Sequence, residues 1–402
     1  MSPPPEPDSP PRSDPRTRAL LAVLSVVVVD LVGFGIAIPV LPFLARDFDA
    51  TGVQLGLILT AYAGAQFAFA PVWGRLSDRI GRRRVMLATI AGTSAALLWL
   101  GLADSLLTLF LARLLAGAFS ANVSVAAAYI TDVTDESERT TWMGRLGACF
   151  GVGFVLGPAL GAAFSGWGHG APMLVAAALA AGNLAYAWFA LAEPAREPVA
   201  PDAAAPERVG RFAALAEPTV RRVCLLNLAF SIAVVQLETV FAFFMNDRFG
   251  YGVFEVAWIF VGMAVLMGGI QGGGMKALSA RFAEGQMLRA GSLLLAVSIA
   301  WVPLAGSVAV LLIPLAFSAV GRAVLQPSMM SLVSLRARPE HRGVVLGTFQ
   351  SFASLGRVVG PVAAGLLYDA KIAAPFWFAS ALLLVLCLAA VGLTDEPASD
   401  SQ

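Results

Sequence analysis

The stretch ERTTWMGRLGACFGVGFVLGPALG, residues 138–161, returns in altered form as HRGVVLGTFQSFASLGRVVGPVAAG at residues 341–365. At an offset of 203 residues the matched positions are Arg139 with Arg342, Gly144 with Gly347, Gly153 with Gly356, and Gly157-Pro158 with Gly360-Pro361. A shorter match, at an offset of 202, places LSDRIG from Leu76 over LSARFA from Leu278. Because both offsets are about half the chain length, the sequence predicts one structural unit written twice.

Composition places both copies in a membrane. Hydrophobic residues make up 58% of the 402 residues, charged residues only 13%, and the mean hydropathy is +0.77. A soluble domain of this composition would aggregate, whereas apolar runs of about 20 residues cross a bilayer as helices. The alternation typical of membrane barrel strands is missing, so we expect an all-α integral membrane protein. Twelve spans are expected, at 19–44, 52–73, 85–103, 105–131, 143–166, 171–192, 222–246, 253–275, 287–306, 308–333, 343–368 and 373–393.

The repeat divides these helices into two pseudo-symmetric six-helix bundles. We expect a disordered, proline-rich cytoplasmic leader at 1–18, the first bundle at 19–193, a cytoplasmic linker at 194–220, the second bundle at 221–394, and a cytoplasmic tail at 395–402. The first apolar run is too long for a signal-peptide core, so we expect it to be retained. Two related halves with a substrate site at the midplane are typical of transporters.

Positive residues predict the orientation, because cytoplasmic loops of membrane proteins are rich in lysine and arginine. With the N-terminus inside, 21 basic residues face the cytoplasm and three face outward. The three are Arg46, Arg248 and Lys371, and another three lie within helices. We therefore expect a multi-pass protein of a bacterial-type plasma membrane with both termini in the cytoplasm.

Several classes of function lack support in the sequence. Neither a P-loop nor a G-x-S-x-G elbow occurs, so an ATP-driven pump or a hydrolase is not indicated, and we expect no enzyme activity. The three cysteines lie in predicted spans and the two histidines in loops without a metal-binding pattern. We expect no metal, no cofactor and no nucleic-acid partner, a proton gradient as energy source, and a monomer in the bilayer.

The loop at residues 74–84 permits a comparison with a known family. The chain resembles the major facilitator superfamily, whose signature G-x-L-x-D-R-x-G-R-R is matched at Gly74, Leu76, Asp78, Arg79, Gly81, Arg82 and Arg83. The two glycines would let the loop turn tightly and the helix ends approach closely. The resemblance implies that Asp78 accepts from the N-terminal amides of the eleventh helix while the arginines engage acids such as Asp132, in a latch that breaks for inward opening. The alternative, topogenic positive charge, does not account for the acid Asp78.

Other helices are similar to those of drug/proton antiporters, and especially of tetracycline/proton antiporters. The first span matches at Asp30, Gly33, Gly35, Pro39 and Pro42, and the fourth at Arg113 and Gly117. The fifth carries the antiporter signature at Gly147, Gly151, Gly153, Gly157, Pro158 and Gly161. Glycines recurring every four residues leave a bare groove in which another helix packs, and packing is most of what we expect of them.

Charges inside the bilayer are costly, about 2.5–3.5 kcal/mol each at a helix centre, and so indicate function. They are Asp30, Arg113, Glu238, Arg322 and Arg357. We expect Asp30 and Glu238 to bind protons or substrate and Arg113 to be a fixed positive partner, because a guanidinium keeps its proton. The alternative is structural ion pairing, of Asp30 with Arg113 and of Glu238 with Arg322 or Arg357.

Polar residues complete the predicted cavity. Asn227, Ser231 and Glu238, spaced at four and seven residues, would form one stripe facing it, and Asn122 and Gln236 are further candidates. The sequence departs from tetracycline antiporters in having no acid in its third or ninth span, and Ala280 replaces the loop acid in the second half. Lipophilic drugs of another kind therefore fit as well as a metal-chelated tetracycline.

Three functions compete. We expect proton-coupled efflux of a drug-like molecule, such as tetracycline or another lipophilic antibiotic, by alternating access. An uptake symporter or facilitator for a metabolite would share the fold and the signature loop. A non-transporting membrane receptor would not need buried charges at mid-membrane.

Overall fold

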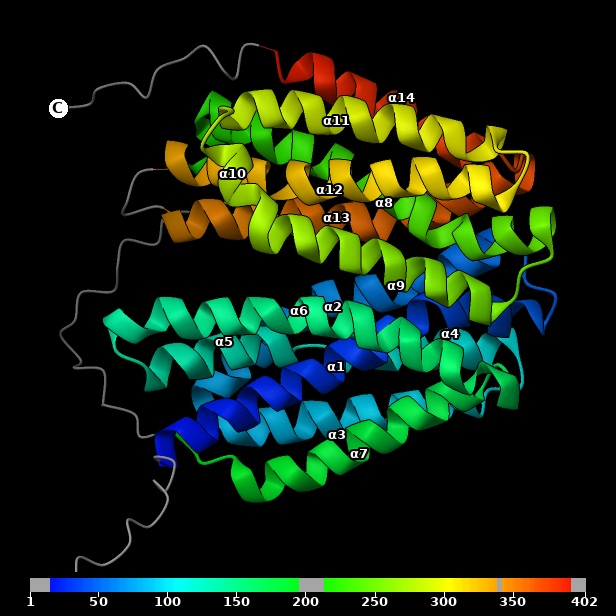
Figure 1. Ribbon diagram of the computed structural model, residues 1–402. Helices are drawn as coiled ribbons and strands as arrows, with labels where there is room; N and C mark the ends of the chain where they lie inside the picture. The colour runs from blue at the N-terminus through cyan, green and yellow to red at the C-terminus, as the bar shows by residue number, and fades with distance from the viewer. Residues whose placement is uncertain (1–14, 195–212, 338–341, 392–402) are drawn as a thin grey trace, which may run out of the picture.

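The computed structural model describes residues 15–194, 213–337 and 342–391. The first half contains α1 Pro15–Arg46, α2 Gly52–Ile80, α3 Arg82–Gly101, α4 Leu106–Phe119, α5 Asn122–Val133, α6 Glu136–Phe164 and α7 Ala171–Ala190. The second contains α8 Pro218–Phe249, α9 Val253–Gly269, α10 Met275–Ser279, α11 Glu284–Trp301, α12 Val308–Arg336, α13 Arg342–Ala370 and α14 Ala374–Ala389. Figure 1 shows them as two bundles, one above the other. Most of the expected leader and linker, and all of the tail, lie outside the described residues.

The expected twelve-helix architecture is confirmed. Among the described residues, eleven helical segments are long and apolar enough to cross a membrane, and α14 is a shorter apolar helix of 16 residues. The span expected at 253–275 is not one regular helix, because α9 passes through a π-turn at Ile270–Gly274 into α10. That turn contains three consecutive glycines, and glycine has a low propensity for regular helix.

The span expected at 105–131 is also interrupted, and the break positions polar groups inside the bundle. Backbone angles of φ −80° and ψ 71° take Ser120 out of the helix between α4 and α5. The indole of Trp73 donates to the carbonyl of Ala118 at 2.6 Å, and the amide of Gln66 donates to the carbonyl of Ser120 at 3.4 Å. Side chains of α2 therefore satisfy backbone groups that hydrocarbon could not.

Matched glycines pack matched helices in the two halves. A Cβ atom at Gly153 of α6 would lie 2.5 Å from the Cβ of Leu31 on α1. In the second half, a Cβ atom at Gly356 of α13 would lie 2.6 Å from the Cβ of Ser231 on α8. The repeat in the sequence is thus a repeat of helix packing, in which small residues let two backbones approach.

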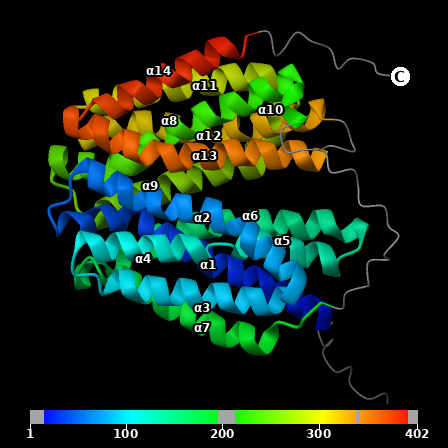
Figure 2. The same ribbon diagram turned by 180° about the vertical axis from the view of Figure 1, so that it is seen from behind.

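The two ends of the molecule differ. We call the end with residues 74–84 the basic end, and the end where α1 turns into α2 and α13 into α14 the opposite end. The opposite end lies at the right in Figure 1 and at the left in Figure 2. Among the described residues, every hydrogen bond between the two halves lies either at Thr60 or between Thr60 and the opposite end. The halves are therefore joined at that end.

Candidate functional site

Asp30, in the middle of α1, is held by side chains from two other helices of the first half. The amide nitrogen of Asn122 donates to Asp30 Oδ1 at 3.1 Å. The Asn122 amide oxygen in turn accepts from the hydroxyl of Thr89 on α3 at 2.6 Å. Asn122 is the first residue of α5, so the break after α4 brings this amide to the carboxylate.

Arg113 lines the same cavity as Asp30, but no acid is bonded to it in the described structure. Its side chain is buried, and its guanidinium carbon lies 4.3 Å from the ring centroid of Tyr62. Among the described residues no ion pair joins Arg113 to Asp30, and Arg113 Nε has no hydrogen-bond partner. Both residues line a cavity of about 20 Å³ together with Tyr62, Thr93 and Ser120. A cavity of this size is enough for about one water molecule.

A second acid–base cluster occupies the second half. Arg322 Nη1 on α12 donates to Glu238 Oε1 on α8 at 2.5 Å, so this acid is paired. Arg357 on α13 interacts electrostatically with Glu238, with Arg322 and, across the interface, with Tyr62. The structure therefore brings Glu238, Arg322 and Arg357 together at the boundary with the first half.

The expected polar stripe on α8 does not face a cavity. Asn227 is buried and donates to the carbonyl of Phe349 at 2.8 Å. Gln236 is buried and donates to the carbonyl of Gly360 at 3.1 Å, and Ser231 packs under Gly356. The prediction for Asn227, Ser231 and Gln236 was wrong because the glycines of α13 let α8 approach so closely that its amides bond to the α13 backbone. Glu238 alone of that stripe stays partly exposed.

Exposed polar residues are found on α13 instead. Gln350, Ser351 and Arg357 are exposed although they belong to a membrane span. Polar and charged side chains within a bilayer face the bundle interior or a water-filled space rather than lipid. Gln350 and Arg357 lie seven residues apart on one face of α13, and we conclude that this face is turned away from lipid.

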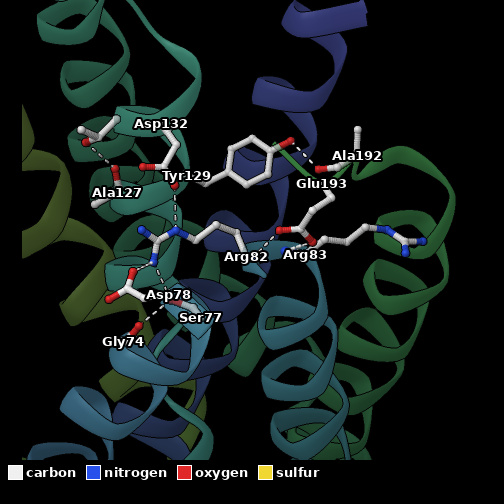
Figure 3. Close-up of polar contacts among 11 residues, drawn as sticks. Gly74, Ser77, Asp78, Arg82, Arg83, Ala127, Tyr129, Asp132, Ala192 and Glu193 are labelled. Carbon is white, nitrogen blue, oxygen red and sulfur yellow. Dashed lines mark hydrogen bonds and ion pairs between the residues drawn. The ribbon is translucent and has the colours of Figure 1, made fainter. Parts of the chain in front are cut away.

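The signature loop forms a network within the first half (Figure 3). Arg82 Nη1 lies 2.6 Å from Asp78 Oδ1 and also donates to the hydroxyl of Ser77 at 2.6 Å. Arg82 Nε donates to Asp132 Oδ2 on α5 at 2.8 Å. Asp132 is thus an acid for this cluster, as the sequence suggested. The latch between Asp78 and the eleventh helix stays a prediction.

Gly81 and Gly74 play different parts in that loop. Gly81 has φ +108°, and a Cβ atom there would lie 2.6 Å from Oε1 of Glu193. That carboxylate accepts from the backbone amides of Arg82 at 2.6 Å and Arg83 at 3.1 Å, at the start of α3. Gly74 lies inside α2, and a Cβ atom there would meet open space, so its expected role in a close approach was wrong.

The remaining loop arginines differ in their contacts. The guanidinium of Arg83 donates to the carbonyls of Leu191 at 2.8 Å and Trp188 at 2.7 Å, near the end of α7. Arg79 is exposed. Because Glu193 and Arg83 join the loop to the last turn of α7, the loop is anchored within its own half.

The glycines of the fifth-span signature divide between two faces of α6. Gly153, Gly157 and Gly161 contact α1. Pro158 belongs to the same helix and lies near Gly35. A Cβ atom at Gly147 or Gly151 would meet no atom of another helix within 4 Å in the described structure, so the expected groove is shorter than the signature. A shift of two residues moves a side chain to nearly the opposite side of a helix, which explains the division.

Contacts at the opposite end were missed by the sequence analysis. Arg46 is the last residue of α1, and it forms an ion pair of 2.8 Å with Asp247 of α8. The hydroxyl of Tyr368 donates to the same carboxylate at 2.8 Å. Asp369 accepts from the backbone amides of Gly52 at 2.7 Å and Val53 at 2.9 Å. Acids at the ends of the α8 and α13 spans were the available signal, but nothing in their spacing pointed to partners in the other half.

Comparison with known families agrees with the fold. The family model described as Major Facilitator Superfamily matches residues 23–276 and 274–402. This chain belongs to the major facilitator superfamily. It is therefore a multi-pass secondary transporter of small molecules and not an enzyme.

Two relatives within the superfamily carry names that describe drug resistance. The tetracycline resistance protein, class C, of Escherichia coli is 31% identical over 389 residues, covering 93% of this chain and 96% of that protein. Multidrug resistance protein 1 of Bacillus subtilis (strain 168) is 27% identical over 369 residues, covering 91% and 92%. This major facilitator protein is thus related to tetracycline and multidrug efflux antiporters.

Solved structures extend the comparison. The human organic anion transporter MFSD10 (TETRAN) is 26% identical, with a TM-score of 0.67 and coverage of 95% of this chain and 100% of that one. A bacterial homologue of the human lysosomal transporter Spinster, in an inward-facing and unoccupied conformation, has a TM-score of 0.77 at 16% identity, covering 95% and 96%. The similarity to the Spinster homologue shows that this chain shares its fold.

Proposed function

We propose that this chain exports drug-like small molecules in exchange for protons, in a bacterial-type plasma membrane with both termini in the cytoplasm. Tetracycline and other lipophilic antibiotics are the first substrates to test. The observation that carries the proposal is Asp30, an acid inside the bilayer that is bound by the neutral amide of Asn122 and not by an arginine. An acid in a permanent ion pair has little reason to exchange a proton, whereas an acid held by an amide is free to do so.

The arrangement around Asp30 supports proton exchange coupled to substrate binding. Arg113 lines the same cavity, so a proton on Asp30 changes the field at the cation. At the cavity, the hydroxyl oxygens of Tyr62 and Ser120 lie 2.7 Å apart, and the side-chain amide of Gln66 donates to Ser120 Oγ at 2.9 Å. Tyr62 and Gln66 lie on α2, the helix that meets α13 of the other half. A change at Asp30 is thus close to the surface along which the halves rock.

We further propose that each half moves as a unit, residues 19–193 against 221–394, around the site between them, with 194–220 as linker. The relationship to a tetracycline resistance protein and a multidrug resistance protein supports efflux over uptake. The structure, joined at the opposite end, would be the state that loads substrate from the cytoplasm. A monomer contains every part of this site.

Inside-out membrane vesicles test the proposal. They are energised to an acidic interior, and the pH gradient is followed while tetracycline and a panel of other drugs are added. We expect a substrate to collapse the gradient in wild-type vesicles and not in Asp30→Asn or empty vesicles. If no compound changes the gradient while the protein is folded and inserted, efflux antiport is wrong, and the uptake of metabolites becomes the function to test.

A further inference from the structure

Arg357 occupies the point at which the two halves separate. Next to Arg357, the carbonyl of Val358 accepts from the hydroxyl of Thr60 on α2 at 2.8 Å. One turn closer to the opposite end, the backbone of Pro361 lies against Gly56 of α2. One turn closer to the basic end, Gly64 of α2 has no atom within 4 Å of the position its Cβ would take. Arg357 is exposed at the boundary between these two regions. Arg357 therefore lies where the close contacts between α2 and α13 end.

No acid is bonded to the guanidinium of Arg357 in the described structure. Among the described residues, Arg357 has no ion pair and no hydrogen bond to its side chain, because the nearby acid Glu238 is bonded to Arg322. Away from the ends of the spans, the bilayer interior contains three arginines, at 113, 322 and 357, and two acids, at 30 and 238. The site thus carries a positive surplus, which grows when an acid takes up a proton. An arginine inside a bilayer is stabilised by water or by an anion, since it does not lose its proton.

An aromatic wall lies on the other side of the same boundary. Tyr62, which interacts electrostatically with Arg357, has its ring centroid 5.6 Å from that of Phe34. The Phe34 ring lies at 6.1 Å from the ring of Phe154 on α6. The boundary therefore offers one exposed cation beside a cluster of rings, an arrangement suited to a ligand with a charged head and an apolar body.

We infer that Arg357 binds a negatively charged group of the transported molecule, so that this protein carries amphipathic organic anions with a carboxylate, sulfonate or phosphate. The inference rests on the proposed function and names its substrate class. A guanidinium binds such groups through two parallel hydrogen bonds. A cationic substrate, such as a metal-chelated drug, would meet repulsion from the same surplus of arginines. Export of an anion is also favoured by a membrane potential that is negative inside.

Matched probes test this inference on the full chain in phosphatidylcholine nanodiscs. Binding of 2-naphthoate, 2-naphthalenesulfonate, neutral 2-naphthamide and a naphthylmethyl-trimethylammonium ion is measured by calorimetry at one pH without a gradient. We expect the two anions to bind at least tenfold more tightly than the amide, and the cation most weakly. Tightest binding of the cation, or equal binding of all four probes, would overturn the inference.

Variants assign the preference to one residue. Arg357→Gln should weaken anion binding about tenfold and leave 2-naphthamide unchanged, while Arg357→Lys should retain part of the preference. Glu238→Gln should strengthen anion binding at least threefold, because it releases Arg322, and a merely structural role of these residues would not produce that gain. Lys371→Gln, whose ammonium lies over the Trp377 ring at the opposite end, is the control and should change nothing. An unchanged anion preference in Arg357→Gln would contradict the assignment.

Two further outcomes are separable. If phosphatidylglycerol in the nanodisc competes with the naphthyl anions, the site belongs to a lipid headgroup and the assignment to a transported molecule is wrong. Binding is measured without a gradient and so does not depend on transport. If the vesicle assay fails, proton antiport is wrong, and the anion preference is still tested by the binding measurements.

Discussion

Asp369, in the last turn of α13, accepts a hydrogen bond of 2.7 Å from the backbone amide of Gly52, the first residue of α2. A helix in one half is thus capped by an acid from the other, and the charge also complements the positive end of the helix dipole. This geometry resembles the latch that we expect of Asp78 at the basic end, but it lies at the opposite end. The bond exists only while the halves are closed there, so it favours that state over the one in which they have parted.

Asp369→Ala should therefore open the opposite end. The loss of a helix cap costs about 0.5–2 kcal/mol, which lowers the ratio of closed to open molecules about 2- to 30-fold. Spin labels at Asp49 and Ile372, in a chain without its native cysteines, should show longer distances. The control is Asp104→Ala, because Asp104 lies at the same end and bonds only to Ser105 and Thr108 of its own half in the described structure. Equal distance distributions for both variants would show that the cap does not hold the halves together.

Gly157→Ala should destabilise the first half. Its Cβ atom would fall 2.6 Å from the Cα of Gly35, and the helices have to move apart to admit it. Overpacking of this kind costs about 1–3 kcal/mol. Gly151→Ala, six residues earlier in the same helix, places a methyl group in open space and should leave stability unchanged or slightly higher. Thermal unfolding in detergent separates the two, and a similar Tm for both variants would contradict this account of the packing.

The fold followed from the sequence because it depends on patterns that are written along the chain. Apolar runs of sufficient length predicted the helices, and the offset between the Gly-Pro stretches predicted the two halves. The break in the fourth span did not follow, because it depends on partners: Ser120 leaves the helix where Gln66 and Trp73 of α2 donate hydrogen bonds to the freed carbonyls. Local propensity at residues 118–122 does not contain that information.

Site residues could be predicted from the sequence where the free-energy cost of a charge inside the bilayer marks them. They could not be predicted where the packing of helices decides which way a side chain points. Asp30, Arg113, Glu238, Arg322 and Arg357 stood out because charges within a bilayer are expensive whatever surrounds them. Helical spacing alone placed Asn227 and Ser231 on a cavity face, whereas the direction of that face depends on how closely α13 packs against α8. Asp369 and Asp247 were missed because their partners belong to the other half.

Gly81→Ala should be much more damaging than Gly74→Ala, although both glycines belong to the signature loop. At φ +108° a side chain costs about 1–2 kcal/mol, and the new methyl group would also displace the Glu193 carboxylate from the amides of α3. Gly74 lies within regular helix beside open space, where alanine favours the helix by about 1 kcal/mol. We expect a lower Tm for Gly81→Ala and an unchanged or higher Tm for Gly74→Ala. The reverse order would show that the loop does not have this backbone conformation.

Asn122→Leu should abolish most proton-coupled transport while the protein still folds. The substitution is nearly isosteric, but it removes the amide that donates to Asp30 at 3.1 Å and the acceptor of the Thr89 hydroxyl. A half-buried carboxylate that loses its donor is left unsatisfied at a cost of up to about 1–3 kcal/mol, so Asp30 no longer keeps both its charged form and its position. We expect at least a tenfold loss of substrate-dependent collapse of the pH gradient in inside-out vesicles. Thr93→Val is the matched control, because the Thr93 hydroxyl lines the same cavity and has no protein partner in the described structure. Normal transport by Asn122→Leu, or an equal loss in both variants, would separate proton exchange from the bond between Asn122 and Asp30.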